Sequence, residues 1–223
     1  MKILALDTST EYCSVALWNG GEIDAREVLA GQRHSKLLLG MVDEMLGRHH
    51  LGVRDLDGIA FGAGPGSFTG LRIACGVTQG IAFGAGLPVV GVSTLLAMAE
   101  AVGADRALCC LDARMEQVYH AAYARNGNRW RTVHAPGLYA PAEAPLLQDG
   151  SWTGCGSGFK AYPGALAQRY AGRLSAIMPD VYPHARDIAR LAVPEFEQGR
   201  AESAERAAPV YIRDKVAMRS DER

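Results

Sequence analysis

The chain has 223 residues, of which 48% are hydrophobic and 21% charged, and its formal net charge at pH 7 is −1. This length suffices for one large domain or two small ones, and the near-neutral charge without a Lys/Arg run argues against an autonomous nucleic-acid-binding protein. No apolar stretch approaches the length needed to span a bilayer, and no secretory leader is visible. The sequence therefore predicts a cytoplasmic protein without a membrane partner.

The first half of the chain carries strand and helix signals in a definite order. Short apolar runs predict the strands, and apolar residues that recur at i, i+4 and i+8 predict the first helix. Three consecutive strands come first, and helices and strands then alternate. The predicted elements are strands at 3–7, 13–18 and 23–29, a helix at 35–48, a strand at 56–61, a helix at 70–84, a strand at 88–92 and a helix at 93–102.

The second half repeats this order in a weaker form. It predicts strands at 107–111, 118–124 and 130–135, an irregular connection at 136–150, helices at 164–170 and 187–197, and a flexible tether at 200–208. Pro194 is a potential break in the last helix. Arg125, Arg129 and Arg131 are the nearest approach to a basic cluster, and we interpret them as a solvated hairpin. We place the boundary near residue 104, which gives units 1–104 and 105–223.

The most informative segment is residues 64–72, which read Gly-Pro-Gly-Ser-Phe-Thr-Gly-Leu-Arg between a predicted strand and a predicted helix. A helix N-terminus points free N–H groups outward and favours anions. The spacing is nevertheless not that of a Walker A loop, because Leu71 and Arg72 follow Gly70, nor that of a dinucleotide fingerprint. On spacing alone we favour a glycine turn in which Ser67 or Thr69 caps the helix.

This whole segment resembles the hallmark of the bacterial TsaB (YeaZ) family. Residues 3–10, Ile-Leu-Ala-Leu-Asp-Thr-Ser-Thr, are similar to the family's opening strand and turn, and residues 209–217 are similar to its closing motif. The resemblance implies an α/β fold of two tandem ribonuclease H-like domains, the actin/Hsp70/sugar-kinase (ASKHA) superfold, with a degenerate second domain.

The resemblance also implies a function and partners. The chain would be a non-catalytic scaffold for threonylcarbamoylation of the adenosine 3′ of the anticodon, in tRNAs that read codons beginning with A. It would form a heterodimer with a TsaD homologue and help to recruit a TsaE homologue, with a TsaC-type enzyme as a further candidate partner. We expect a homodimer when the chain is alone, tRNA contact only through the complex, and no cofactor bound by this chain alone, although ATP or ADP could bind at the interface of the complex.

No metal site is predicted. The TsaD family, which TsaB resembles, holds its metal with two histidines at i, i+4 spacing, and Thr94 and Met98 occupy those places here. None of the six histidines forms an i, i+4 pair, and the five cysteines are odd in number and fit reduced thiols. The missing histidine pair argues against a third candidate function in this superfamily, that of a metallopeptidase.

A nucleotide cleft is the alternative site. Asp7 ends the first predicted strand, where an actin-like ATPase places an acidic residue for hydrated Mg²⁺, and Thr8, Ser9 and Thr10 could supply hydroxyl groups. The second unit offers Asp112, Ala113 and Arg114 at the matching turn. Both turns lack the glycines that let a backbone wrap phosphate, and Asp7 could equally cap a local turn. No catalytic residue is assigned, but a Mg-dependent ATPase or phosphotransferase stays the alternative function.

The predicted partner interface lies on two helices. The helix at 35–48 carries more apolar residues than a small sheet needs, and a glycine stripe on the helix at 70–84 lets another helix approach closely, although it could pack within the domain instead. We also assign Arg72 here; with Tyr211 and Arg213 it is a candidate for cleft or tail contacts or for a structural ion pair. The interface set is Leu38, Met41, Val42, Met45, Arg72, Gly76, Gly80 and Gly84.

Overall fold

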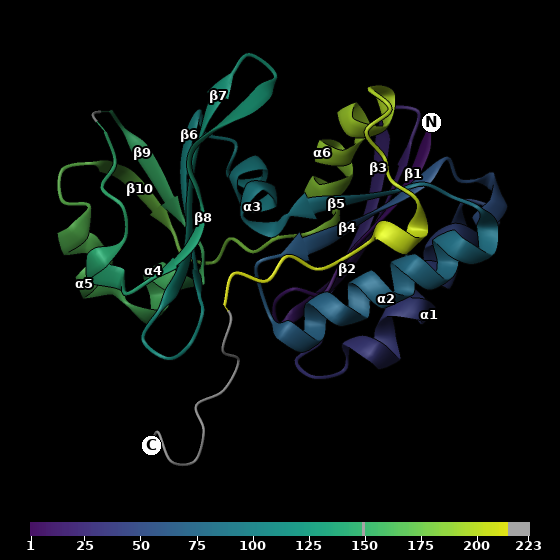
Figure 1. Ribbon diagram of the computed structural model, residues 1–223, viewed down its shortest axis with the longest axis horizontal. Helices are drawn as coiled ribbons and strands as arrows, with labels where there is room; N and C mark the ends of the chain where they lie inside the picture. The colour runs from purple at the N-terminus through teal and green to yellow at the C-terminus, as the bar shows by residue number, and fades with distance from the viewer. Residues whose placement is uncertain (149, 214–223) are drawn as a thin grey trace.

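The first half of the chain forms a five-stranded mixed sheet (Figure 1). The computed structural model describes residues 1–148 and 150–213. The sheet has the order β3-β2-β1-β4-β5, in which β1 pairs antiparallel with β2 and parallel with β4. Both of its faces are covered, so β1 is an unbroken apolar run from Ile3 to Leu6. Its strands are β1 (Lys2–Asp7), β2 (Tyr12–Asn19), β3 (Glu22–Leu29), β4 (Gly58–Gly64) and β5 (Val89–Ser93).

The second sheet repeats this topology. Its order is β10-β9-β6-β7-β8, with an antiparallel meander followed by two parallel strands, as in the first sheet. The duplication confirms the predicted fold class of two tandem ribonuclease H-like units. The sequence missed β9 and β10 as strands. The strands are β6 (Arg106–Asp112), β7 (Val118–Asn126), β8 (Arg129–Tyr139), β9 (Trp152–Cys155) and β10 (Leu174–Met178).

Six α-helices and three 3₁₀ turns complete the described residues 1–148 and 150–213. Only η2 lies in the described part of the connection between β8 and β9, where the first unit has α1, so the second unit is reduced there. Both α2 and α3 end at glycines in the left-handed conformation, Gly86 and Gly103. The elements are α1 (His34–Arg48), α2 (Phe68–Ala85), α3 (Thr94–Val102), α4 (Ser157–Ala161), α5 (Pro163–Arg169), α6 (Ala185–Glu197), η1 (Val53–Asp55), η2 (Pro141–Glu143) and η3 (Ala204–Arg206).

The two units exchange helices. Helix α3 follows the first sheet but packs on the second, where Leu95 and Met98 join a cluster with Cys109 of β6. Helix α6 follows the second sheet but packs on the first, where Ile188 and Ala192 are fully buried. The predicted unit 105–223 therefore does not correspond to one packed body, because α6 covers the first sheet (Figure 1).

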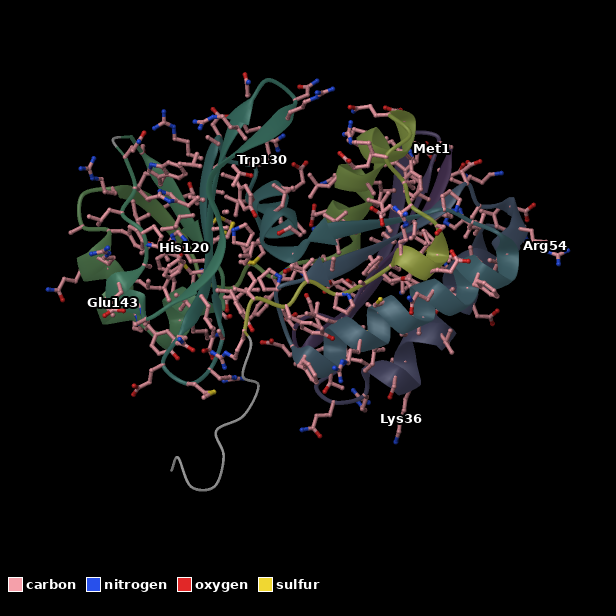
Figure 2. All side chains as sticks on the ribbon, in the orientation of Figure 1. Met1, Lys36, Arg54, His120, Trp130 and Glu143 are labelled. Atoms are coloured by element: carbon pink, nitrogen blue, oxygen red, sulfur yellow. The ribbon has the colours of Figure 1, made fainter. Side chains whose placement is uncertain are left out.

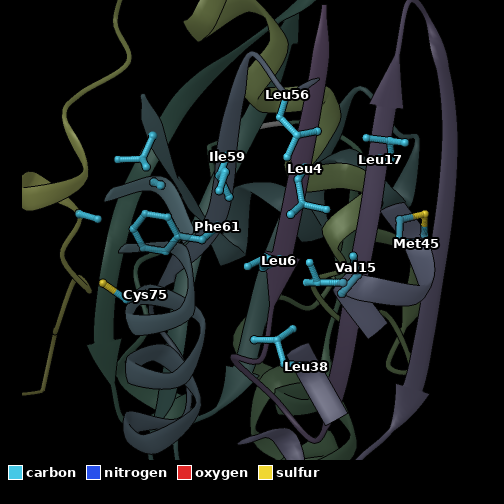
Figure 3. Packing of buried hydrophobic residues seen from close by; sticks show 14 of the residues in the cluster. Leu4, Leu6, Val15, Leu17, Leu38, Met45, Leu56, Ile59, Phe61 and Cys75 are labelled. Atoms are coloured by element: carbon cyan, nitrogen blue, oxygen red, sulfur yellow. The ribbon is translucent and has the colours of Figure 1, made fainter. Parts of the chain in front are cut away.

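The largest core lies between the first sheet and the helices α1 and α2. Figure 3 shows Leu38 and Met45 of α1 grouped with side chains of β1, β2 and β4. This cluster also takes in Ala204 and Ala207, which are 6% and 8% exposed. The segment 200–208 is thus packed and is not the flexible tether that the sequence predicted.

Two further sequence expectations change in the structure. Pro194 does not break α6, which continues to Glu197. The Arg125 side chain, expected to be solvated, lies against Trp130 and donates to Glu100 Oε2 at 2.9 Å. Among the described residues, no helix is both long and apolar enough to cross a membrane.

We predict that Glu100 clamps α3 to the β7–β8 hairpin. Its Oε2 atom accepts from Arg125 Nη2 at 2.9 Å and from Trp130 Nε1 at 2.7 Å, and its side chain is 17% exposed. Glu100→Ala leaves both donors without this acceptor, so the free energy of unfolding in urea should fall by about 1–3 kcal/mol. Glu44→Ala, which removes the exposed pair with Arg26, is the control and should change it by less than about 1 kcal/mol. Equal effects of the two variants would contradict the clamp.

Candidate functional site: an interdomain cleft and an exposed helical face

The segment 64–72 joins β4 to α2 as a tight turn. The peptide bond between Gly64 and Pro65 is cis, and Gly64 has φ +120°, which favours glycine. Ser67 is the N-cap of α2, and its side chain accepts from the backbone N–H of Gly70 at 3.3 Å. The helix therefore begins two residues earlier than predicted, with Ser67 and not Thr69 as the cap.

This turn packs directly against the end of β1. Ser67 N donates to Ser9 O at 2.7 Å, and Thr8 Oγ1 donates to Gly70 O at 2.7 Å. A Cβ atom at Gly66 would lie 2.5 Å from Ser9 O, and one at Gly70 would collide with Thr8 O. The glycines of the segment therefore allow two backbones to touch, and the space beside the first turn is filled by protein.

Asp7 is buried behind this contact. Its Oδ1 atom accepts from Ser9 N at 3.1 Å and from Ser9 Oγ at 2.9 Å, whereas its Oδ2 atom has no partner and lies against Gly62. Burial raises the pKa of Asp7 to about 7, and the two hydrogen bonds from Ser9 oppose that rise. Of the four predicted cleft residues, only Ser9 and Thr10 line the cleft; Asp7 and Thr8 do not.

The cleft itself lies between the two units and has a volume of about 1100 Å³. The segment 64–72 and the start of α2 form one wall, and the turn between β6 and β7 forms the other. The C-terminal residues border it as well. Its charged side chains are Glu11, Asp112, Arg114, Lys160 and Arg213, so both signs are present.

A C-terminal strap, residues 209–213, runs along the cleft and joins its two walls. Val210 N donates to Ala63 O at 2.7 Å, and the Arg72 guanidinium lies 3.7 Å from the centre of the Phe68 ring and donates to the Tyr211 hydroxyl at 2.9 Å. Arg72 is thus a tail anchor in this structure. The rest of the closing motif, residues 214–217, lies outside the described residues.

Arg213 carries the strap across to the second unit. Its Nη2 atom donates to Gln117 Oε1 at 2.7 Å. The turn that it reaches has an unusual backbone, since Arg114, Met115 and Glu116 have φ of +61°, +53° and +58°. Left-handed backbone costs a non-glycine residue about 1–2 kcal/mol, and nothing in the sequence signals three in a row.

The Asp112 carboxylate stabilises this turn. Its Oδ1 atom accepts from Arg114 N at 2.8 Å and from the Tyr162 hydroxyl at 3.2 Å, and its Oδ2 atom lies 3.0 Å from Arg114 Nη1. The predicted second phosphate turn therefore uses its acidic side chain for local bonds.

The two positions where a TsaD-type metal site would have histidines are buried. Thr94 Oγ1 donates to Pro65 O, and Met98 lies with α3 against the second sheet. Within the described part of the chain, no group of three or more His, Cys, Asp or Glu side chains is placed to hold a metal ion. All five cysteines are buried and free, and burial raises the pKa of the Cys13 thiol to about 12.

The predicted partner residues divide into two sets. Leu38, Val42 and Met45 are 0%, 4% and 0% exposed, so they belong to the core and cannot form a surface. Met41 is half-buried. The predicted glycine stripe is open: Gly76, Gly80 and Gly84 are exposed, and nothing lies within 4 Å of a Cβ atom built at any of them.

Apolar side chains flank this open stripe. Phe83 is 70% exposed, and the half-buried Ile73, Val77 and Ile81 lie along α2. Helix α1 is beside α2 (Figure 1) and adds Leu37 and Met41. We call this surface the helical face; it consists of Leu37, Met41, Ile73, Gly76, Val77, Gly80, Ile81, Phe83 and Gly84. The sequence analysis missed Phe83, although its position between Gly80 and Gly84 was the available signal.

Comparisons with known proteins agree with this architecture. Residues 28–220 match the family described as TsaD, tRNA N6-adenosine threonylcarbamoyltransferase. The protein named tRNA threonylcarbamoyladenosine biosynthesis protein TsaB of Escherichia coli is 39% identical, covering 98% of this chain and 97% of its own. The protein of the same name from Haemophilus influenzae is 38% identical over 98% of this chain and 96% of its own. The solved structure of YeaZ from Pseudomonas aeruginosa is 37% identical with a TM-score of 0.88, covering 94% of this chain and 99% of its own.

The two sheets and the family match define a protein with a TsaD-type, two-unit ribonuclease H-like fold. Within that class, the full-length similarity is to the TsaB proteins, as the hallmark segment predicted. The chain belongs to the TsaB (YeaZ) family of tRNA threonylcarbamoyladenosine biosynthesis proteins.

We predict opposite effects for two glycine substitutions in α2. Gly70→Ala drives a Cβ atom into Thr8 O and should lower the free energy of unfolding by about 2 kcal/mol or more. Gly76→Ala meets open space and should raise it by about 0.5–1 kcal/mol, because alanine favours helix more than glycine does. Chemical denaturation of both variants tests this, and a neutral Gly70→Ala would contradict the close packing of the turn.

We also predict a pH effect of Asp7. Its folded pKa of about 7 lies above the value of 3.8 for the unfolded chain, so the folded state holds the extra proton. The contribution of Asp7 to stability is therefore full below about pH 4 and is lost as the pH rises toward and through 7. Asparagine does not ionise, so Asp7→Asn removes this pH-dependent loss of stability. The difference in unfolding free energy between variant and parent should shift in favour of the variant by a few kcal/mol between pH 4 and 8. Parallel pH curves would rule the effect out.

Proposed function

We propose that this chain is a non-catalytic subunit of the tRNA threonylcarbamoylation machinery, acting in the cytoplasm as the binding partner of a TsaD homologue. The observation that carries the proposal is the helical face, where an open glycine stripe is flanked by apolar side chains on α1 and α2. Exposed contiguous apolar surface is a mark of protein interaction sites. Glycines at one helix face let a second helix approach closely, so a helical partner fits this surface.

A TsaD homologue is the favoured partner because it shares this fold. The match of residues 28–220 to the TsaD family means that a partner would carry helices equivalent to α1 and α2. Two such helix pairs can pack face to face around a pseudo-twofold axis. The same geometry would allow two copies of this chain to pair when the partner is absent.

A scaffold role also fits the residues at the positions of a catalytic relative. Thr94 and Met98 stand where TsaD has its histidines, and both are buried in packing contacts. The packing of the hallmark turn over Asp7 disfavours the alternative of a Mg-dependent ATPase or phosphotransferase. In this proposal a TsaE homologue binds the assembled pair, a TsaC-type enzyme supplies the activated threonylcarbamoyl group, and tRNA is modified by the partner.

We predict that a charge in the glycine stripe disrupts the complex. Gly80→Arg should keep the fold, because its Cβ atom meets open space and arginine favours helix over glycine. It should weaken binding to the TsaD homologue at least roughly tenfold, because an arginine cannot be accommodated where two helices touch. Size-exclusion chromatography with light scattering, followed by calorimetry of the mixture, measures this.

The matched control is Gly164→Arg, in α5 of the second unit, where a Cβ atom also meets open space. This variant should bind the partner as the parent does. Absence of a complex between the parent chain and the TsaD homologue would refute the proposed function. A complex that tolerates Gly80→Arg would instead refute the helical face as its interface.

A further inference from the structure

The strap lies over the interdomain cleft as a surface segment. Its residues 210–213 all line the cleft, yet Val210 and Tyr211 are 54% and 44% exposed, so one side of the strap faces solvent. In Figure 2 the strap passes from the first unit, which carries the labelled Lys36, to the second, which carries the labelled His120. A segment with few buried contacts can open locally while the cores on either side stay folded.

The end of the strap on the first unit is held by the hallmark segment. Val210 N donates to the end of β4, and a Cβ atom at Gly64 would lie only 2.6 Å from Val210 O. The centres of the Tyr211 and Phe68 rings are 5.3 Å apart, and the Tyr211 hydroxyl accepts from Arg72. Backbone, ring and hydroxyl contacts together fix this end, so two motifs that are far apart in the sequence form one seat.

The end on the second unit is held by a single side chain. Arg213 Nη2 donates to Gln117 Oε1 at 2.7 Å and to Arg114 O at 3.4 Å. Its Nη1 atom donates to Met115 Sδ at 3.1 Å. No backbone–backbone hydrogen bond joins residues 211–213 to the rest of the described chain. Loss of the contacts of one guanidinium group is therefore enough to release this end.

The turn that Arg213 holds has a strained backbone. Arg114, Met115 and Glu116 all have positive φ, which a residue with a side chain adopts at a cost. Such strain persists only where surrounding contacts determine the conformation. The Asp112 carboxylate supplies part of that support and Arg213 the rest. Release of Arg213 lets the turn relax, so the strap and the turn form an element with two arrangements.

We propose that the strap is a lid on the cleft, which opens at its Arg213 end and hinges at Tyr211. Opening gives access to a volume of about 1100 Å³. Pockets for small molecules have volumes of about 300–1,000 Å³, so the lid controls a space large enough for such a ligand. The two units need not rotate for this motion, because α3 and α6 hold the angle between them.

Hydrogen exchange of the full chain, measured by mass spectrometry, tests which end opens. Arg213→Gln should speed exchange of the amides of residues 113–117 roughly tenfold, because the turn loses bonds that hold it. The Val210 amide should exchange as in the parent. Gln117→Ala, which removes an acceptor of Arg213 from the other side, should also speed exchange in the turn. The control is Arg206→Gln, an exposed arginine in η3, which should change neither site.

Paired spin labels test whether the units stay in place. Thr69→Cys and Ala161→Cys put labels at exposed positions on opposite walls of the cleft, and the five native cysteines are buried. The distance between the labels should be the same with and without Arg213→Gln. A longer distance in that variant would make Arg213 a brace between the units and overturn the lid. Unchanged exchange at residues 113–117, or equal acceleration at Val210, would overturn it as well.

Discussion

The exchange of α3 and α6 between the sheets is the contact on which the rest of the molecule depends. Each sheet needs a helix on the face that looks toward the other unit, and each receives it from the opposite half of the chain. Separating the units would expose Leu95 and Met98 on one side and Ile188 and Ala192 on the other, all of them fully buried. At roughly 1.5–3 kcal/mol for each large apolar side chain, this burial fixes the angle between the units. The cleft is a consequence of that fixed angle, and the strap with its Arg213 contact closes one side of it.

The glycines of the hallmark segment serve packing within the protein. Glycine turns often let a ligand approach a backbone closely, whereas here Gly66 and Gly70 let the backbone of residues 8 and 9 approach. The carboxyl group of Asp7 is therefore excluded from solvent, and this burial raises its pKa. The same contact sets the direction of α2, because Ser67 both bonds to Ser9 and caps the helix. The position of the helical face is therefore coupled to the packing of the hallmark segment.

The sequence predicted what is local and missed what is distant. Buried strands such as β1 and β4 were predictable, because a short apolar run between turn signals fits few structures other than a buried strand. Strand β10 was not, because it is an edge strand whose residues from Ser175 to Met178 are exposed and do not alternate. The place of α6 depends on contacts such as Ala185 N with Ser14 Oγ, between residues 171 apart. The site followed the same rule: the periodicity of α1 marked its apolar residues, but could not say that Leu38 and Met45 face the sheet while Met41 is partly open.

The proposed partner surface lies on one unit only. The helical face belongs to α1 and α2 beside the first sheet (Figure 1). A partner docked on the proposed helical face keeps a fixed position relative to the second unit only if the two units do not rotate. The helix exchange and the Glu100 clamp supply that rigidity, because both cross or brace the boundary between the sheets. A partner bound at the proposed helical face would therefore keep a fixed orientation relative to the cleft and the second unit.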